Sequence, residues 1–196
     1  MTSNMALSLR QLSRLLAFIG TVFIITTVLV PAPAPAEDND ALEQRVKAAF
    51  LYKFAGYIEW PQNLFSQPDT PITIAVMGDD PLAAELSQLV VGRTVNGRPV
   101  TVRKLRDIEP SAVVHILFVG RDDSARLGEV ARALQPRPIL IVTESEGALT
   151  QGSIINFLLV DGHVRFEIAL DTAEKKGLKL SSRLLAVAQN VRTDTP

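Results

Sequence analysis

Functional side chains crowd into one short segment near the C-terminus. From residue 163 to residue 182 the sequence places His163, Arg165, Glu167, Ser181 and Ser182. An imidazole, a guanidinium, a carboxylate and hydroxyls are the groups from which hydrolases assemble a nucleophile, its base and an anion-stabilising donor. The same groups also occur on surfaces at which proteins bind each other. Which of the two applies depends on what the rest of the chain supplies.

The two serines lack the local signatures of a nucleophile. Neither G-x-S-x-G nor S-x-x-K occurs in the chain. Ser181 stands just before an apolar stripe with helical spacing, which runs from Leu184 to Val191, so we expect it to cap that helix, with Ser182 in the first turn. The sequence therefore predicts no catalytic residue and no enzymatic activity.

Metal ligands are also missing from the pattern. The two histidines, His115 and His163, have no partners at metal-ligand spacing, and the chain contains no cysteine. His115 lies inside an apolar run, which predicts a satisfied and partly buried side chain. No metal site and no cofactor is expected, and thiol redox chemistry is excluded because there is no thiol.

Asp79 and Asp80 offer an alternative kind of site. They follow an apolar strand and precede a helix, which is the place where open α/β sheets bind small ligands. Asp80 before Pro81 is equally typical of an ordinary helix N-cap. A ligand-binding role for the two aspartates therefore stands beside a capping role.

Composition limits the class of partner. The 196 residues are 47% hydrophobic and 21% charged, with a net charge of −1, as expected for a compact globular protein. There is no run of five basic residues, so the counterion release that drives binding to nucleic acid would be small. We therefore expect no nucleic-acid partner.

The first 36 residues have the pattern of an export signal. Arg10 and Arg14 precede an uncharged apolar run at 15–30, and PAPAPA and an acidic segment follow. This order is typical of a secretory signal peptide, here with cleavage after Ala36. The alternative is an uncleaved anchor, but the apolar run would span only roughly 24 Å as a helix, against a hydrocarbon core of about 30 Å.

The remaining chain alternates between helical and strand patterns. Apolar spacing predicts a first helix up to about residue 57, with Asp40 and Glu43 forming a capping box at its start. Further helices are expected at 81–90 and 124–134, and strands at 72–77, 99–104, 113–120 and 138–143. Continuous apolar strands of this kind predict an α/β fold whose sheet is covered on both faces.

Asp161 and Gly162 stand between two strand-like runs and predict a two-residue hairpin turn. With that turn, one face carries three apolar pairs and is expected to be core: Leu159/Val164, Phe157/Phe166 and Ile155/Ile168. The other face is mixed: Val160/His163, Leu158/Arg165 and Asn156/Glu167. A mixed face suits a surface that a helix, a subunit or a partner protein partly covers.

The sequence therefore favours a docking surface over an active site. The candidate protein-binding residues are Leu158, Val160, His163, Arg165 and Glu167. Trp60, in the loop after the first helix, is added as an aromatic anchor, because aromatic side chains dominate protein interfaces; core packing is the default for it and for Phe65.

Several segments resemble, in this order and spacing, the YfiR-like family of exported bacterial proteins. They are AAFLYKFAGYIEWP, ITIAVMGDDPLAAEL, VHILFVG, GSIINFLLVDGHVRFEIAL and AEKKGLKLSSRLLAVAQNV. The resemblance implies a three-layer α/β sandwich, with a mixed central sheet, a C-terminal hairpin and helices on both faces. It divides the chain into a signal peptide (1–36), a short segment (37–43), the YfiR-like domain (44–191) and a tail (192–196).

The resemblance implies a periplasmic regulator and not an enzyme. In the family, such a protein represses an inner-membrane diguanylate cyclase by binding its periplasmic sensor region, and an OmpA-like outer-membrane lipoprotein sequesters it. Cyclic-di-GMP, exopolysaccharide and biofilm are the outputs, and dimers are known, so a homodimer is expected. An exported small-ligand sensor acting on a different membrane protein is the alternative.

The chain departs from the family pattern at a few positions. Val114 stands before His115 where relatives often have cysteine, and Lys53 and Ala169 stand where asparagine is expected. Ser153 and Ile154 replace a usual Gly-Met pair. These changes leave the expected fold intact and exclude the redox modulation that disulfides give in the family.

Overall fold

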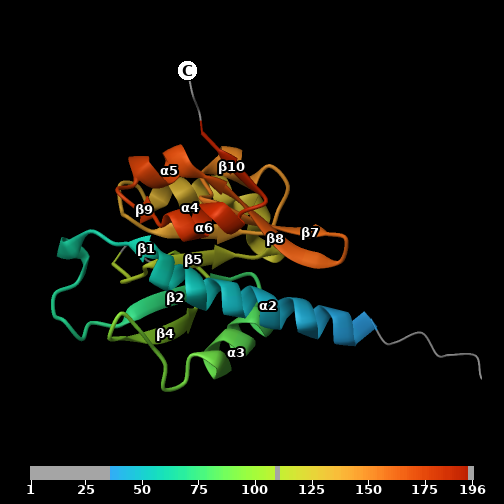
Figure 1. Cartoon of the computed structure of the whole chain (residues 1–196), viewed down its shortest axis with the longest axis horizontal. Helices are drawn as coiled ribbons and strands as arrows, with labels where there is room; N and C mark the ends of the chain where they lie inside the picture. Colours follow the sequence, from blue (N-terminus) through green and yellow to red (C-terminus); the bar gives the residue numbers. More distant parts are fainter. Residues whose placement is uncertain (1–35, 109–110, 194–196) are drawn as a thin grey trace, which may run out of the picture. The chain divides into compact units, whose positions relative to one another are not determined.

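A computed structural model of the protein describes residues 36–108 and 111–193 (Figure 1). Its helices are α2 (Ala36–Tyr57), α3 (Asp80–Leu89), α4 (Leu127–Ala133), α5 (Leu170–Lys175) and α6 (Ser182–Val187), with short 3₁₀ helices η1 (Gln62–Leu64), η2 (Arg121–Arg126) and η3 (Ala148–Gln151). Its strands are β1 (Ile58–Glu59), β2 (Ile72–Met77), β3 (Thr94–Val95), β4 (Arg98–Lys104), β5 (Ile116–Val119), β6 (Leu140–Thr143), β7 (Ile155–Val160), β8 (His163–Ala169), β9 (Lys179–Leu180) and β10 (Asn190–Arg192).

The large sheet has the strand order β10-β8-β7-β6-β5-β2-β4-β3. Strands β4, β2, β5, β6 and β7 run parallel to their neighbours, β8 returns antiparallel to β7, and β10 is parallel to β8. After β2 the chain forms β4 on one side and then β5 on the other. The strand order therefore reverses between β2 and β5, which is the switch point of the sheet.

Helices cover both faces of this sheet, which confirms the predicted three-layer α/β sandwich. One core joins the sheet to α2, α3 and α6 through Phe54, Leu86 and Leu184. The other core joins the opposite face to α4 through Leu127 and Val130. Strands β2, β5 and β6 are buried along their whole length, which explains their continuous apolar sequences.

The hairpin register is confirmed pair by pair, from Ile155 opposite Ile168 to Val160 opposite His163. Phe157 and Phe166 pack under α2, where their rings lie 5.9 Å and 5.2 Å from that of Phe54. The prediction that Leu159 and Val164 belong to the core is wrong: Leu159 is 57% exposed and Val164 is only half-buried. The turn of the hairpin and the start of α2 lie toward the same side of the domain (Figure 1).

Three predictions about helix ends had different outcomes. Helix α2 begins at Ala36, so Asp40 lies inside it and the predicted capping box is wrong. Asp79, not Asp80, caps α3, because its carboxylate accepts the Leu82 N–H. Ser181 caps α6 as predicted.

The last part of the domain differs from the sequence pattern. The predicted helical stripe continues to Val191, but α6 ends at Val187 and the chain then forms strand β10. Residues 1–35 of the predicted signal peptide (1–36) lie outside the described residues, and its last residue, Ala36, is the first residue of α2. Among the residues that the structure describes, no helix is long and apolar enough to span a membrane.

Candidate functional site

The hairpin tip, defined as residues 158–165, is the best candidate for a functional surface. A two-residue turn forms it, with φ of 50° at Asp161 and 73° at Gly162, as a turn of this kind requires. Because β7 runs parallel to β6, the tip lies at the C-terminal ends of the parallel strands. A small recess there brings Leu158 and Leu159 against Glu144 of the loop after β6.

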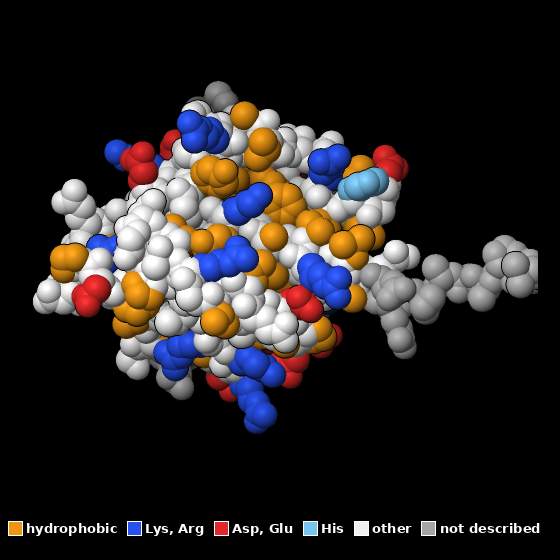
Figure 2. All heavy atoms as spheres, turned by 60° about the horizontal axis from the view of Figure 1, so that its bottom comes forward, with side chains coloured by type: hydrophobic (Ala, Val, Ile, Leu, Met, Phe, Trp, Pro, Cys, Tyr) orange, Lys and Arg blue, Asp and Glu red, His pale blue; other side chains and the backbone are white. Residues whose placement is uncertain are grey.

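Apolar side chains lie on both faces of the hairpin tip. Leu158 and Val160 on one face and Val164 on the other are half-buried, and Leu159 is mostly exposed. Figure 2 shows apolar side chains gathered beside the one histidine visible on that face, and His163 is the exposed histidine of the described residues. Exposed apolar clusters on a soluble domain typically mark binding sites.

The polar groups of the tip are a hydrogen-bonded imidazole and a free cation. The Nδ1 of His163 lies 2.8 Å from the Asp161 carbonyl, which accepts its hydrogen bond and orients the ring. The exposed Arg165 has no hydrogen bond or ion pair to any other described residue. The tip therefore combines apolar side chains with a guanidinium that could donate hydrogen bonds to a carboxylate of a partner.

Glu167 lies outside this surface. It is 8% exposed, and its two carboxylate oxygens accept hydrogen bonds from Asn156 and Arg192, each at 3.1 Å. The Thr143 hydroxyl donates in turn to Asn156 at 2.8 Å. This buried network links β6, β7, β8 and β10, so Glu167 braces the sheet.

Trp60 lies at the opposite end of the parallel strands from the hairpin tip. Its indole N–H donates to the Ala55 carbonyl at 3.3 Å, and its ring makes an edge contact, at 5.8 Å between centroids, with His115 just before β5. The tip contains the last residues of β7 and the first residues of β8, at the other end of the parallel strands. The structure therefore does not bring Trp60 together with the other predicted protein-binding residues.

His115 is fully buried, so the prediction of a partly buried and satisfied side chain is wrong. Its Nδ1 accepts the Thr73 N–H at 3.0 Å, while its Nε2 has no hydrogen-bond partner in the described residues. Burial, and then the charges of Arg98 and Arg137, lower the pKa of His115 to about 4. The imidazole is therefore neutral at neutral pH.

A pocket of about 760 Å³ lies at the switch point of the sheet, and Asp79 and Asp80 are among its lining residues. Gly78 lines the pocket, and Gly120 packs closely against it: a Cβ on Gly120 would lie 2.3 Å from the Gly78 carbonyl oxygen. Both aspartates already have protein partners. Asp79 caps α3 and accepts from Gln44 at 3.2 Å, and Asp80 pairs with Lys104 at 2.7 Å.

Sequence reasoning missed the buried lysine in this pocket. The Lys47 side chain is 4% exposed and its ammonium pairs with Glu43 and with the buried Glu144. Arg121 lies 3.9 Å from Glu144 at the mouth of the pocket. The spacing of Glu43 and Lys47, four residues apart on a helix, is the one signal in the sequence that could have indicated part of this cluster.

The two serines take structural positions. The Ser181 hydroxyl accepts the Leu184 N–H at 3.3 Å, and Ser182 begins α6. Within the described residues neither serine hydrogen-bonds to a histidine, and no group of three His, Cys, Asp or Glu side chains is placed to hold a metal ion. The crowd of functional groups in the sequence therefore does not converge in space.

Comparisons with known proteins give a family for most of the chain. The model of a family described as YfiR/HmsC-like matches residues 44–189. A crystal structure of a conserved domain protein from Vibrio cholerae O1 biovar El Tor is similar at 10% identity, with a TM-score of 0.49, and the alignment covers 76% of this chain and 60% of that one. The comparison with curated proteins gave no match.

Proposed function

The chain belongs to the YfiR/HmsC-like family, and on that premise we propose that it binds and represses the periplasmic sensor region of an inner-membrane diguanylate cyclase. Family membership itself implies a periplasmic regulator of cyclic-di-GMP signalling. Repression would lower cyclic-di-GMP, exopolysaccharide and biofilm output. The function is carried by binding and not by catalysis.

The hairpin tip supports this proposal best. Leu159 is 57% exposed, and Leu158, Val160 and Val164 keep part of their apolar surface in contact with water. Each fully buried aliphatic side chain contributes about 1.5–3 kcal/mol, so a partner that covers several of them gains substantial affinity. The tip therefore supplies the apolar centre of the proposed interface.

Arg165 and His163 would orient the partner on this apolar centre. Both are exposed, and Arg165 has no partner among the described residues. Charged groups around an apolar centre mainly fix register and speed association. We therefore propose a complementary surface on the sensor region with apolar side chains and at least one carboxylate facing Arg165.

Two further partners are part of the proposal. We propose that the chain forms a homodimer and that an OmpA-like outer-membrane lipoprotein sequesters it; the family relationship supports both. Light scattering on the purified protein tests the dimer. Competition between the lipoprotein and the cyclase sensor region for the protein tests sequestration.

Capture from membranes tests the main proposal. Tagged protein would be incubated with membranes of its own cells, and bound proteins would be identified by mass spectrometry. We expect a membrane protein that carries a periplasmic sensor region and a diguanylate cyclase domain. Leu159→Asp should lose that partner, whereas Val91→Asp should retain it, because Val91 is 77% exposed and lies after α3, outside the hairpin. Equal capture by both variants would contradict the role of the tip.

The switch-point pocket favours a second candidate function, an exported small-ligand sensor. Six carboxylates line the pocket (Asp40, Glu43, Asp79, Asp80, Asp122 and Glu144) against the two cations Lys47 and Arg121, so the lining carries −6 + 2 = −4 charges. A ligand there would be a cation. Spermidine at about 100 times Kd should add roughly 2.7 kcal/mol to the free energy of unfolding. No thermal shift with spermidine would remove this candidate.

A further inference from the structure

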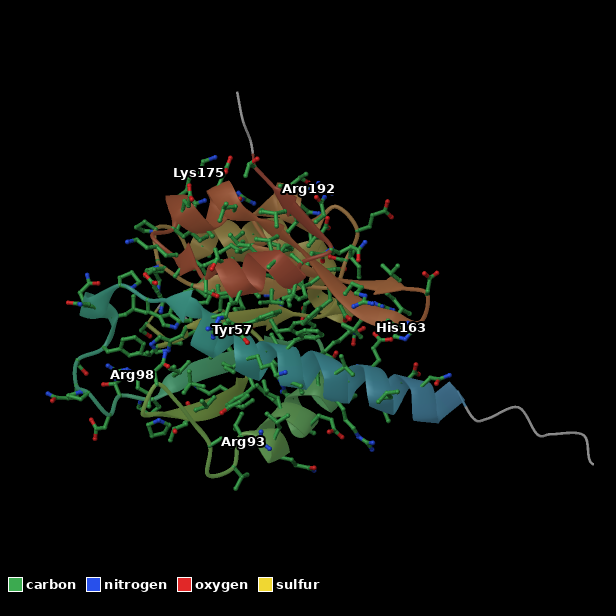
Figure 3. All side chains as sticks on the ribbon, viewed as in Figure 1. Tyr57, Arg93, Arg98, His163, Lys175 and Arg192 are labelled. Atoms are coloured by element: carbon green, nitrogen blue, oxygen red, sulfur yellow. The ribbon has the colours of Figure 1, made fainter. Side chains whose placement is uncertain are left out.

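A second pocket, of about 720 Å³, lies near the N-terminal ends of the parallel strands, at the opposite end from the hairpin tip. Its walls come from the end of α2 (Tyr57), the loop that follows (Trp60, Gln62), the β3–β4 turn (Asn96) and the residue before α6 (Ser181). Figure 3 shows Arg98 toward one end of the domain, His163 toward the other, and Tyr57 between them. The volume is within the range of small-molecule sites.

One wall of this pocket is held in place by stacked side chains. The Phe65 ring stacks on the imidazole of His115, 4.8 Å away at an interplanar angle of 7°, and the guanidinium of Arg98 lies 4.0 Å from the ring centre. Arg98 also donates to the carbonyls of Gln67 and Thr70, at 2.8 Å and 3.2 Å. These contacts fix the loop after α2, so the wall is formed before any ligand arrives.

Trp60 and Tyr57 give the pocket an aromatic surface. Both are half-buried, and the bond from the Trp60 indole N–H to Ala55 fixes the orientation of its ring. An aromatic ring held in this way presents a flat, polarisable surface. A ligand with at least one flat apolar face would pack against it.

The polar groups of the pocket are both donors and acceptors. Gln62 and Asn96 carry amides, which donate and accept; Glu59 only accepts and Arg98 only donates. The Ser181 oxygen accepts from the Leu184 N–H, which leaves its own hydrogen to donate. An anion would face the carboxylate of Glu59, and an apolar ligand would leave the amides unpaired. Hydroxyl groups, which donate and accept, match the whole set.

We propose that this pocket binds a neutral saccharide. A sugar ring offers a flat face of C–H groups for Trp60 and a rim of hydroxyls for the amides of Gln62 and Asn96. The site is separate from the hairpin tip, so the proposal of saccharide binding does not depend on the proposed repression of a cyclase.

Trp60 makes the test direct, because it is the one tryptophan of the sequence and sugars do not absorb where it is excited. Cellotriose, maltotriose and chitotriose would be titrated into the protein up to about 10 mM while Trp60 emission is recorded. We expect a saturable change with at least one of the three. Gln62→Ala should weaken that binding about fivefold, because a hydrogen bond is lost.

Gln151→Ala is the matched control. Gln151 also lies in a short 3₁₀ helix, η3, and is not among the residues that line the pocket. This variant should bind the sugar as the unaltered protein does. The proposal is overturned if none of the three sugars binds, if Gln62→Ala binds unchanged, or if calorimetry detects binding with no response from Trp60.

Discussion

The guanidinium of Arg192 donates a 3.1 Å hydrogen bond to the carboxylate of Glu167 and so ties the last strand, β10, to β8. The second oxygen of Glu167 accepts from Asn156 on β7. A carboxylate this deeply buried needs such partners, because an unpaired buried charge is costly. Strand β10 is therefore an integral part of the sheet.

Arg192→Ala should lower the free energy of unfolding by about 1–2 kcal/mol, because Glu167 loses a hydrogen bond from a charged donor. Lys175→Ala is the control: Lys175 is an exposed cation in the neighbouring α5 (Figure 3), and its loss should change stability by less than about 0.5 kcal/mol. Urea unfolding of both variants measures the difference. Equal stabilities would show that the bond to Glu167 contributes nothing.

Lys47→Ala should be more damaging, with a loss of about 3–5 kcal/mol, because it removes the buried cation from the Glu144 carboxylate and leaves the more exposed Arg121, 3.9 Å away, to offset that charge. The control is Arg45→Ala on the same helix. The Arg45 side chain is 65% exposed and lies 4.0 Å from Glu85, so its loss should cost less than about 1 kcal/mol. Denaturant titration compares the two, and a loss in Lys47→Ala as small as that in Arg45→Ala would refute the expected role of the buried pair.

Two glycine-to-alanine substitutions should have opposite signs. In Gly120→Ala the new methyl would meet the Gly78 carbonyl oxygen at 2.3 Å, so the loops after β2 and β5 must separate. We expect a loss of about 1–3 kcal/mol, as for overpacked interiors. Gly128 lies in α4 with nothing within 4 Å of an added Cβ, so Gly128→Ala should gain up to about 1 kcal/mol. Thermal unfolding gives both signs, and a neutral Gly120→Ala would contradict the tight approach of the loops.

Stability should depend on pH through His115. The folded protein holds the pKa of His115 at about 4, against 6.5 for an ordinary histidine. Between these values the unfolded chain binds a proton that the folded protein does not. The free energy of unfolding should therefore fall as pH drops from about 6.5 to about 4, by up to about 3 kcal/mol, and be unaffected by this group above about pH 7.

Urea unfolding across that pH range measures the effect. His115→Gln should remove this component of the pH dependence, although loss of the stack with Phe65 lowers its stability at every pH. His163→Gln, which alters the exposed histidine, should keep the full dependence. Parallel pH profiles for the protein and His115→Gln would show that His115 is not responsible.

The sequence predicted the sheet and the hairpin because both follow from local patterns. The limits of strand β2, the turn at Asp161 and Gly162, and all six hairpin pairs were predicted correctly from apolar runs and turn residues. The cap at Ser181 was also correct. Each depends on residues that are neighbours along the chain or across a single turn.

The errors at Asp40, at Asp80 and at the end of α6 are local, and the other errors concern contacts between distant segments. Phe157 and Leu159 lie on the same face of β7. Phe157 is buried against Phe54 of α2, whereas Leu159 is 57% exposed. The burial of Glu167 depends on Arg192, 25 residues away, and that of Lys47 on Glu144, 97 residues away. No local period encodes such pairs, so the candidate site could be predicted only in outline.

The most direct test of the proposed repression is the level of cyclic-di-GMP in cells. The gene would be deleted and then replaced by the unaltered sequence, by Leu159→Asp or by Val91→Asp, with equal amounts of each protein confirmed in the periplasm. The account predicts that cyclic-di-GMP rises on deletion, returns with the unaltered protein and with Val91→Asp, and stays high with Leu159→Asp. No rise on deletion, or full restoration by Leu159→Asp, would contradict it.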